Sequence, residues 1–202
     1  MWLTIIVVVL LLLVLRRVSA LWASDAVGPM RRRVTAIVGP EQNGGEPVVL
    51  FLIGSRLNSW PAFFLHLPQV LRFLFLAGPT FNNVGANRKA HGLLNTRIHA
   101  SVIDLLFGDG VVHIQYWKSL EALRTFNTSA DHAASFGQYF RELVNTGAFA
   151  IWHELYVVRP GEYENVYGNC PLIGFGAIPG AKIVEIDKTL ASATARMAAT
   201  KE

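Results

Sequence analysis

Histidine is the residue type in this sequence with the most versatile chemistry, and six histidines are present beside a single cysteine. No two histidines form the HExxH pattern or the i,i+4 spacing of a helical zinc site, and one cysteine cannot form an intramolecular disulfide or a CxxC metal site. The glycine patterns GxGxxG, GxxxxGK(S/T) and GxSxG are also missing from the sequence. We therefore predict no metal and no flavin or nicotinamide cofactor. Haem is the alternative, because a single histidine can be an axial ligand.

His153 and Glu154 are neighbours in the apolar stretch Ala148–Val158, which is typical of a β-strand. Because side chains alternate along a strand, the two residues point to opposite faces of a sheet, and which of them faces a cavity stays open. We take His153 as the candidate general base. His132, near the start of a predicted helical segment, is a second catalytic candidate that would approach His153 across the sheet. A packing or solvent-exposed role is the alternative for both histidines.

Tyr167 and Asn169 lie in a segment rich in glycine and proline, where loops often carry function. We predict that they act as catalytic hydrogen-bond donors to a substrate oxygen. Residues with large amphipathic or charged side chains are predicted to bind the substrate: Tyr116, Trp117, Trp152, Glu154, Tyr156, Arg56 and Phe175. Packing with a satisfied polar tip is the alternative for the aromatic residues, and a salt bridge is the alternative for Arg56.

Composition limits the class of protein. The chain has 202 residues, enough for one folded domain; 52% are hydrophobic and 16% are charged, which excludes a disordered chain or a coiled coil. The formal net charge is +4, and five of the basic residues are arginines in two clusters near the N-terminus. The remainder shows no basic face, so nucleic acid is not a predicted partner.

The N-terminal segment is strongly apolar. Residues 2–15 are interrupted only by Thr4, and the stretch to Trp22 is long enough to cross a bilayer if two arginines reach the headgroups. We therefore predict a membrane anchor over residues 2–22, with the lipid bilayer as partner. The arginines that follow the apolar run predict a single-pass membrane protein whose C-terminal domain is cytoplasmic. A signal peptide cleaved after Val18-Ser19-Ala20 is the alternative.

The rest of the chain has the pattern of one α+β domain. We predict four segments: an anchor at 1–23, a Gly/Pro-rich basic linker at 24–46, the domain at 47–180 and an Ala-rich, partly helical tail at 181–202. Strands are predicted at 48–53, 98–107, 111–117 and 148–158, and helices at 60–77, 119–126 and 131–144, with a polar loop at 82–95. The order β-α-β-β-α-β predicts a ferredoxin-like split βαβ fold. Both faces of the last strand are largely apolar, which predicts a homodimer that forms a dimeric α+β barrel.

Four sequence blocks carry a family resemblance: residues 48–58, Val112–Glu121 (VHIQYWKSLE), Ile151–Val157 (IWHELYV) and Gly161–Gly176. Together they resemble the small monooxygenases similar to the fumagillin-pathway polyketide monooxygenase. The resemblance implies a dimeric α+β barrel that oxidises a hydrophobic natural product such as a polyketide or terpenoid. The chain departs from the family in its apolar first helix and in Cys170, where the family has methionine. Both departures favour a more hydrophobic ligand or contact with the bilayer.

The predicted reaction is a cofactor-independent monooxygenation. The substrate would react with O₂ as an enolate or phenolate, while the protein supplies a base, an oxyanion donor and a dry pocket. A redox-neutral isomerase or cyclase of the same substrate class is the first alternative. A non-catalytic accessory protein that binds a lipophilic intermediate is the second.

Overall fold

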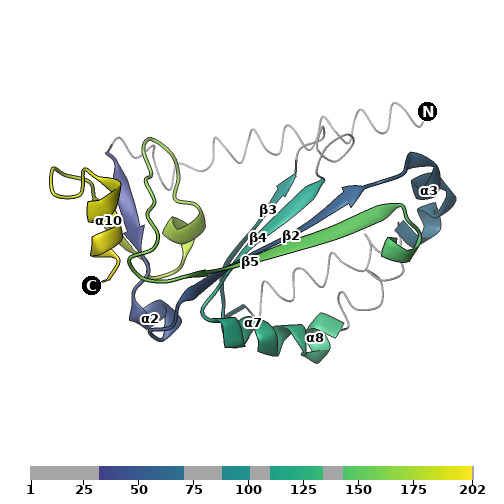
Figure 1. Cartoon of the computed structure of the whole chain (residues 1–202), viewed down its shortest axis with the longest axis horizontal. Helices are drawn as coiled ribbons and strands as arrows, with labels where there is room; N and C mark the ends of the chain where they lie inside the picture. The colour runs from purple at the N-terminus through teal and green to yellow at the C-terminus, as the bar shows by residue number, and fades with distance from the viewer. Residues whose placement is uncertain (1–31, 71–87, 101–109, 134–142, 202) are drawn as a thin grey trace.

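The computed structural model of the chain describes residues 32–70, 88–100, 110–133 and 143–201 (Figure 1). Its centre is a four-stranded antiparallel sheet in the order β3-β4-β2-β5. The strands are β2 (Val48–Leu57), β3 (Leu93–Ala100), β4 (Val111–Trp117) and β5 (Phe149–Val158). The helices on the chain between them include α3 (Trp60–Leu65), α5 (Arg88–His91), α7 (Leu120–Asn127) and α8 (Ala130–His132). This is the predicted ferredoxin-like α+β fold.

The two faces of the sheet are defined by the strict alternation of β2. Val49, Phe51 and Ile53 lie on the face that we call the helix face, because α7 packs Ala122, Leu123 and Phe126 against Val49, Leu93 and Trp117 there. The helix begins where the sequence predicts, after Ser119, whose hydroxyl accepts a hydrogen bond from the backbone N–H of Ala122 at 3.1 Å. Parts of the predicted helices, residues 71–77 and 134–142, lie outside the described residues.

β3 begins at Leu93, five residues before the predicted start at Ile98 and inside the predicted polar loop. A register irregularity between Leu93 and Asn95 interrupts its pairing with β4. β3 is an edge strand, and the polar run Asn95-Thr96-Arg97 within it interrupts the apolar alternation by which a strand is recognised. The predicted part of this strand at 101–107 lies outside the described residues.

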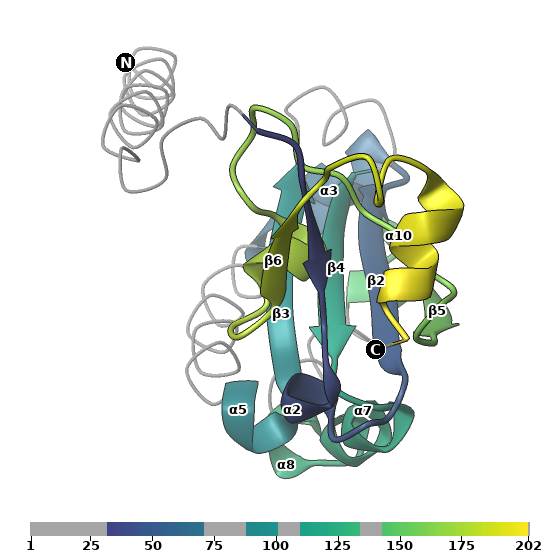
Figure 2. The same cartoon turned by 90° about the vertical axis from the view of Figure 1, so that its left-hand side faces the viewer.

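A second, two-stranded sheet joins the segments that we expected to be a linker and a tail. β1 (Val34–Ile37) pairs antiparallel with β6 (Lys182–Glu185), and all four β1 residues are buried. Helix α2 (Pro40–Asn43) follows β1, the 3-10 helix η3 (Gly174–Ala177) precedes β6, and α10 (Ala193–Ala199) lies close to the C-terminus (Figure 2). Sequence reading missed this sheet because its strands are four residues long and almost 150 positions apart, so neither has a local partner.

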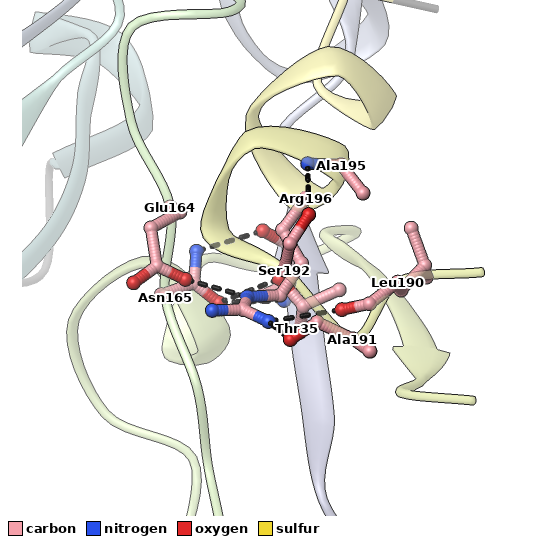
Figure 3. Close-up of polar contacts among 9 residues, drawn as sticks. Thr35, Glu164, Asn165, Leu190, Ala191, Ser192, Ala195 and Arg196 are labelled. Carbon is pink, nitrogen blue, oxygen red and sulfur yellow. Dashed lines mark hydrogen bonds and ion pairs between the residues drawn. The ribbon is translucent and has the colours of Figure 1, made fainter. Parts of the chain in front are cut away.

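Arg196 fastens α10 to the rest of the chain (Figure 3). Its guanidinium Nε donates to the carboxylate of Glu164 at 2.6 Å, and its Nη1 donates to the backbone carbonyls of Leu190 and Ala191 at 2.9 and 2.8 Å. Only 7% of the Arg196 side chain is exposed, whereas the exposed ion pair of Arg159 with Glu162 leaves 61% of its arginine in solvent. The buried guanidinium therefore has its charge paired and several of its donors hydrogen-bonded. These interactions offset the free energy that desolvating a buried ion pair costs.

The predicted localisation is contradicted. No helix in the described part of the chain is long and apolar enough to cross a bilayer. Helix α7, for example, has eight residues and a length of about 12 Å, against a hydrocarbon core of roughly 30 Å. The prediction of a single-pass membrane protein with a cytoplasmic domain is therefore corrected. Residues 2–22, on which it was based, lie outside the described residues.

Replacing Arg196 by methionine should lower the free energy of unfolding by about 3 kcal/mol, because the substitution leaves Glu164 and two carbonyls without their shared donor. Arg159→Met is the matched control, since an exposed pair contributes at most about 1 kcal/mol. Urea denaturation followed by circular dichroism measures both. Equal, small losses in the two variants would show that the buried ion pair does not fasten α10.

Candidate functional site

Two histidines lie in one row across the helix face. In the strand register, Ile53 of β2 is opposite His113 of β4 on one side and opposite His153 of β5 on the other. Residues that are directly paired point to the same face, so both histidines belong to the helix face with Ile53 between them. Strands are about 4.8 Å apart, which separates the two Cα atoms by roughly 10 Å. The register thus creates a histidine row with an apolar centre, defined as His113, Ile53 and His153.

His113 is held by a chain of hydrogen bonds on this face. The indole N–H of Trp117 donates to Gln115 Oε1 at 2.9 Å, and Gln115 Nε2 lies 3.2 Å from His113 Nδ1. The other ring nitrogen of His113, Nε2, is hydrogen-bonded to Thr96 Oγ1. Burial lowers the pKa of His113 from 6.5 to about 4, so this imidazole is neutral at physiological pH.

The alternation along β5 separates His153 from Glu154. His153 is on the helix face, with its ring 5.7 Å from the ring of Phe51, and its side chain is exposed. Glu154 is on the opposite face, where its carboxylate accepts a hydrogen bond of 2.6 Å from the hydroxyl of Tyr156. This hydrogen bond raises the pKa of Tyr156. Of the two neighbours, only His153 shares a face with His113.

His132 lies at a different height of the same face. Its ring is 5.4 Å from the ring of Phe126, which in turn is 5.1 Å from the indole of Trp117. Trp117 is paired with Val49, four residues along β2 from the row of Ile53, which corresponds to about 13 Å. Burial lowers the pKa of His132, while a hydrogen bond with the Asn127 backbone acts in the other direction. The described contacts therefore associate His132 with the aromatic core next to α7 and not with His153.

Tyr167 and Asn169 lie in the loop before η3, where the hydroxyl of Tyr167 is hydrogen-bonded. The Tyr167 hydroxyl donates to the carbonyl of Ile173 at 2.7 Å and accepts from the N–H of Gly176 at 2.9 Å, which closes the loop before η3. Burial raises the pKa of this hydroxyl. Asn169 is exposed, with a backbone φ of 54°, a left-handed conformation that asparagine tolerates better than most residues. Neither residue is on the helix face with the histidine row.

The predicted substrate-binding residues are divided between the faces. Trp117 is on the helix face, fully buried, and is part of the hydrogen-bond chain to His113. The others are on the opposite face or on the segment that covers it: Tyr116, Trp152, Glu154, Tyr156, Arg56 and Phe175. The ring of Phe175 stacks on Tyr163 at 4.5 Å and meets Tyr116 edge-on at 5.2 Å.

The position of the Trp152 indole requires a glycine, Gly54, at the paired position of the central strand β2. A Cβ atom at Gly54 would lie only 2.2 Å from Cε2 of the Trp152 indole, so no side chain fits there. The two residues are directly paired in the register of β2 and β5. Gly54 is therefore required by the packing of an indole on the opposite face and is not a flexible point in the strand.

Sequence reading missed His113, Gln115 and Thr96. The signal that could have found the first two is their spacing with Trp117: positions 113, 115 and 117 alternate, so a strand puts all three on one face. Thr96 could not be found in this way, because its pairing with β4 depends on the irregularity near Leu93. Among the described residues, no group of three or more His, Cys, Asp or Glu side chains is arranged to hold a metal ion.

The fold and the site together define a small ferredoxin-like α+β protein with titratable and amide groups on the helix-covered face of its sheet. Residues 48–175 match the profile of the family described as Monooxygenase af470-like. The match covers more than half of the chain, which therefore belongs to this family, and the resemblance to small monooxygenases seen in the sequence is confirmed.

No curated protein matches the chain. Among solved structures, an aldoxime dehydratase (OxdRE) in complex with butyraldoxime is 22% identical with a TM-score of 0.49, over 72% of this chain and 40% of the dehydratase. The chain thus spans less than half of that enzyme. SnoaB, a cofactor-independent oxygenase from Streptomyces nogalater, is 16% identical with a TM-score of 0.34, over 56% of this chain and 94% of its own. A dimeric ferredoxin-like protein from an uncultured marine organism is 16% identical with a TM-score of 0.36, over 56% and 96%.

Acid should destabilise the protein through His113. Its pKa is about 4 in the folded chain, against 6.5 for an imidazole in the unfolded chain, so between these values the unfolded chain binds more protons. Stability is therefore lost as the pH falls through this window, by up to about 3 kcal/mol from this group. Urea denaturation at several pH values should show a shallower pH dependence for His113→Asn than for wild type. Parallel curves for the two proteins would contradict a neutral, half-buried His113.

Proposed function

We propose that the protein is a cofactor-independent monooxygenase whose substrate, a hydrophobic and enolisable natural product such as a polyketide or terpenoid, lies over Ile53 between His113 and His153. The histidine row carries this proposal. It offers an apolar floor for a hydrophobic ring system and two imidazoles about 10 Å apart at its ends. The aromatic ring of Phe51, next to His153, extends the apolar floor.

His153 is the proposed general base. It removes a proton from a carbon that is conjugated with the substrate carbonyl, which leaves an enolate or phenolate that can give electrons to O₂. For a methylene carbon, the two hydrogens leave, one oxygen atom becomes the new carbonyl, and the other leaves as water. The organic anion supplies the electrons, so the balance needs no further reductant. The protein positions the substrate and takes the proton.

The opposite face of the sheet has a different proposed role, as the interface of a homodimer. Its centre is apolar, with Leu52 and Ile114 side by side, and this row ends in Arg97 on edge strand β3 and in Glu154 on edge strand β5. Both charged side chains are exposed. A second copy related by a two-fold axis parallel to the strands would have its β3 over β5 of the first, so Arg97 of each copy would face Glu154 of the other. This charge complementarity supports a second copy as the partner.

Oxygen dependence tests the proposed reaction. With an enolisable aromatic ketone such as anthrone as the probe, the purified protein should consume O₂ and form a product with one added oxygen atom in place of two hydrogens. His153→Ala should lower the rate at least tenfold, because a positioned base contributes about 10²–10⁴-fold, while the melting temperature stays near that of wild type. Oxygen electrode traces and product mass spectra measure both effects.

A product that forms under strict anaerobiosis, with unchanged elemental composition, would replace the monooxygenase proposal by an isomerase or cyclase. A haem or flavin absorption spectrum in the active fractions would make a histidine a ligand instead of a base. Unfolding of His153→Ala would show that this histidine is a packing residue.

Charge reversal tests the dimer. The full chain should sediment at twice its mass of 22.3 kDa. Arg97→Glu and Glu154→Arg should each raise the dimer dissociation constant tenfold or more, because like charges would then face each other twice across the interface. The double variant should restore dimerisation. Arg124→Glu, on the exposed side of α7, is the control for the change in net charge. A monomeric wild type, or single variants that dimerise as well as wild type, would refute this interface.

A further inference from the structure

In the hydrogen-bond chain from Trp117 to Thr96, every donor points toward Thr96. The hydroxyl proton of Thr96 is therefore left for an acceptor outside this hydrogen-bond chain. We propose that the hydroxyl of Thr96 donates a hydrogen bond to the anionic oxygen of the bound substrate, and that Gln115 and His113 are positioning residues that hold the hydroxyl proton available for it. The inference rests on the proposed function, since it names the group that stabilises the enolate or phenolate formed there. It adds an oxyanion donor that lies on edge strand β3.

The first link fixes the orientation of Gln115. An indole N–H can only donate, so the atom of Gln115 that it meets at 2.9 Å must be the carbonyl oxygen Oε1. The amide nitrogen of Gln115 is then the atom that faces His113, at 3.2 Å from Nδ1. Because an amide NH₂ can only donate, it needs an unprotonated Nδ1 as its acceptor. Trp117 thereby determines the side of the imidazole from which the proton is missing.

The second link fixes the tautomer of His113. A neutral imidazole carries one proton, and with Nδ1 unprotonated that proton is on Nε2, which is the nitrogen bonded to Thr96 Oγ1. His113 therefore donates and Thr96 accepts. The threonine hydroxyl cannot return its own proton to Nε2, so this proton is directed to a different acceptor. All donors in the chain point the same way, from the buried indole of Trp117 to the half-buried Thr96.

This arrangement suits an anion in a site that is poor in water. The hydrogen-bonded groups from Trp117 to Thr96 carry no formal charge, so burying them costs less than burying a cation. Each donor in this series also polarises the next. A hydrogen bond from a neutral hydroxyl to an oxyanion is about twice as strong as one to a neutral carbonyl oxygen. The hydrogen-bond chain would thus favour the deprotonated substrate over the neutral one. The ligand class that follows is a hydrophobic ketone or phenol whose reactive oxygen lies on the β3 side of the histidine row.

The first measurement is the tautomer of His113 in the ligand-free protein. Long-range proton–nitrogen spectra of histidine-labelled protein should show Nε2 protonated and Nδ1 unprotonated in wild type. In Gln115→Glu the carboxylate still accepts from Trp117 but now also accepts from His113, so the proton should move to Nδ1. A wild-type His113 with its proton on Nδ1, or a tautomer unchanged by Gln115→Glu, would overturn the directed chain.

The second measurement uses 4-nitrophenol as the probe, because its ionisation is visible in the absorption spectrum. Wild type should bind the phenolate more tightly than the phenol. Thr96→Val, which removes the hydroxyl at constant shape, should reduce this preference about tenfold, and Thr96→Ser should restore it. Gln115→Glu should cause a similar loss, although it does not touch the probe, because His113 then accepts the Thr96 proton.

Each outcome decides one part of the proposal. A wild type without a preference for the phenolate, or a Thr96→Val variant that keeps the preference, would overturn the role of Thr96. A loss in Thr96→Val without a loss in Gln115→Glu would overturn the positioning role of Gln115 and His113. None of these results depends on oxygen, so a failure here is distinct from a failure of the monooxygenase proposal, which the anaerobic assay decides.

Discussion

The antiparallel pairing of β2 with strands on both of its sides is the constraint on which the rest of the site depends. β2 is central, so each of its residues from 49 to 55 has one neighbour on β4 and one on β5 at the same height and on the same face. That is why His113 and His153, forty positions apart, share a row about Ile53. A shift of one residue in either pairing would turn one histidine to the opposite face, where Glu154 and Arg97 are found. The register is fixed in turn by burial, because Val49 and Trp117 must both meet α7.

The burial of Trp117 determines which polar groups lie beside His113. Trp117 is completely buried, and a buried indole N–H needs an acceptor. Gln115 supplies it from the same strand, two residues earlier, and thereby presents its amide nitrogen to His113. The polar groups on the helix face are thus a consequence of packing a large aromatic residue under α7. The same burial lowers the pKa of His113 and keeps it neutral, which is the state the chain of donors requires.

Features of the structure that neighbouring residues determine could be predicted from the sequence, and features that depend on distant residues could not. The ferredoxin-like order and the start of α7 directly after Ser119 follow from local periodicity and capping, and both agree with the structure. The separation of His153 and Glu154 to opposite faces follows from strand alternation alone. The β1–β6 sheet could not be predicted, since its strands meet only after the whole domain between them has folded. The hydrogen bonds of Tyr167 could not be predicted for a related reason: its hydroxyl closes a loop through Ile173 and Gly176, which no pattern in that segment reveals, and its catalytic role stays a prediction.

Each face of the sheet has its own proposed role, substrate binding on the helix face and dimerisation on the opposite face. At one end of the opposite face, Val38, Val48 and Ile178 are buried beneath the segment that contains η3, and the stacked rings of Tyr163 and Phe175 close this end. Farther along the same face, Leu52 is half-buried between the exposed side chains of Arg97 and Glu154, and Tyr156 is 49% exposed. A base that faced this side would compete with any partner for the same surface. His153 and His113 are on the helix face instead, so the proposed dimer interface and the proposed substrate site do not overlap.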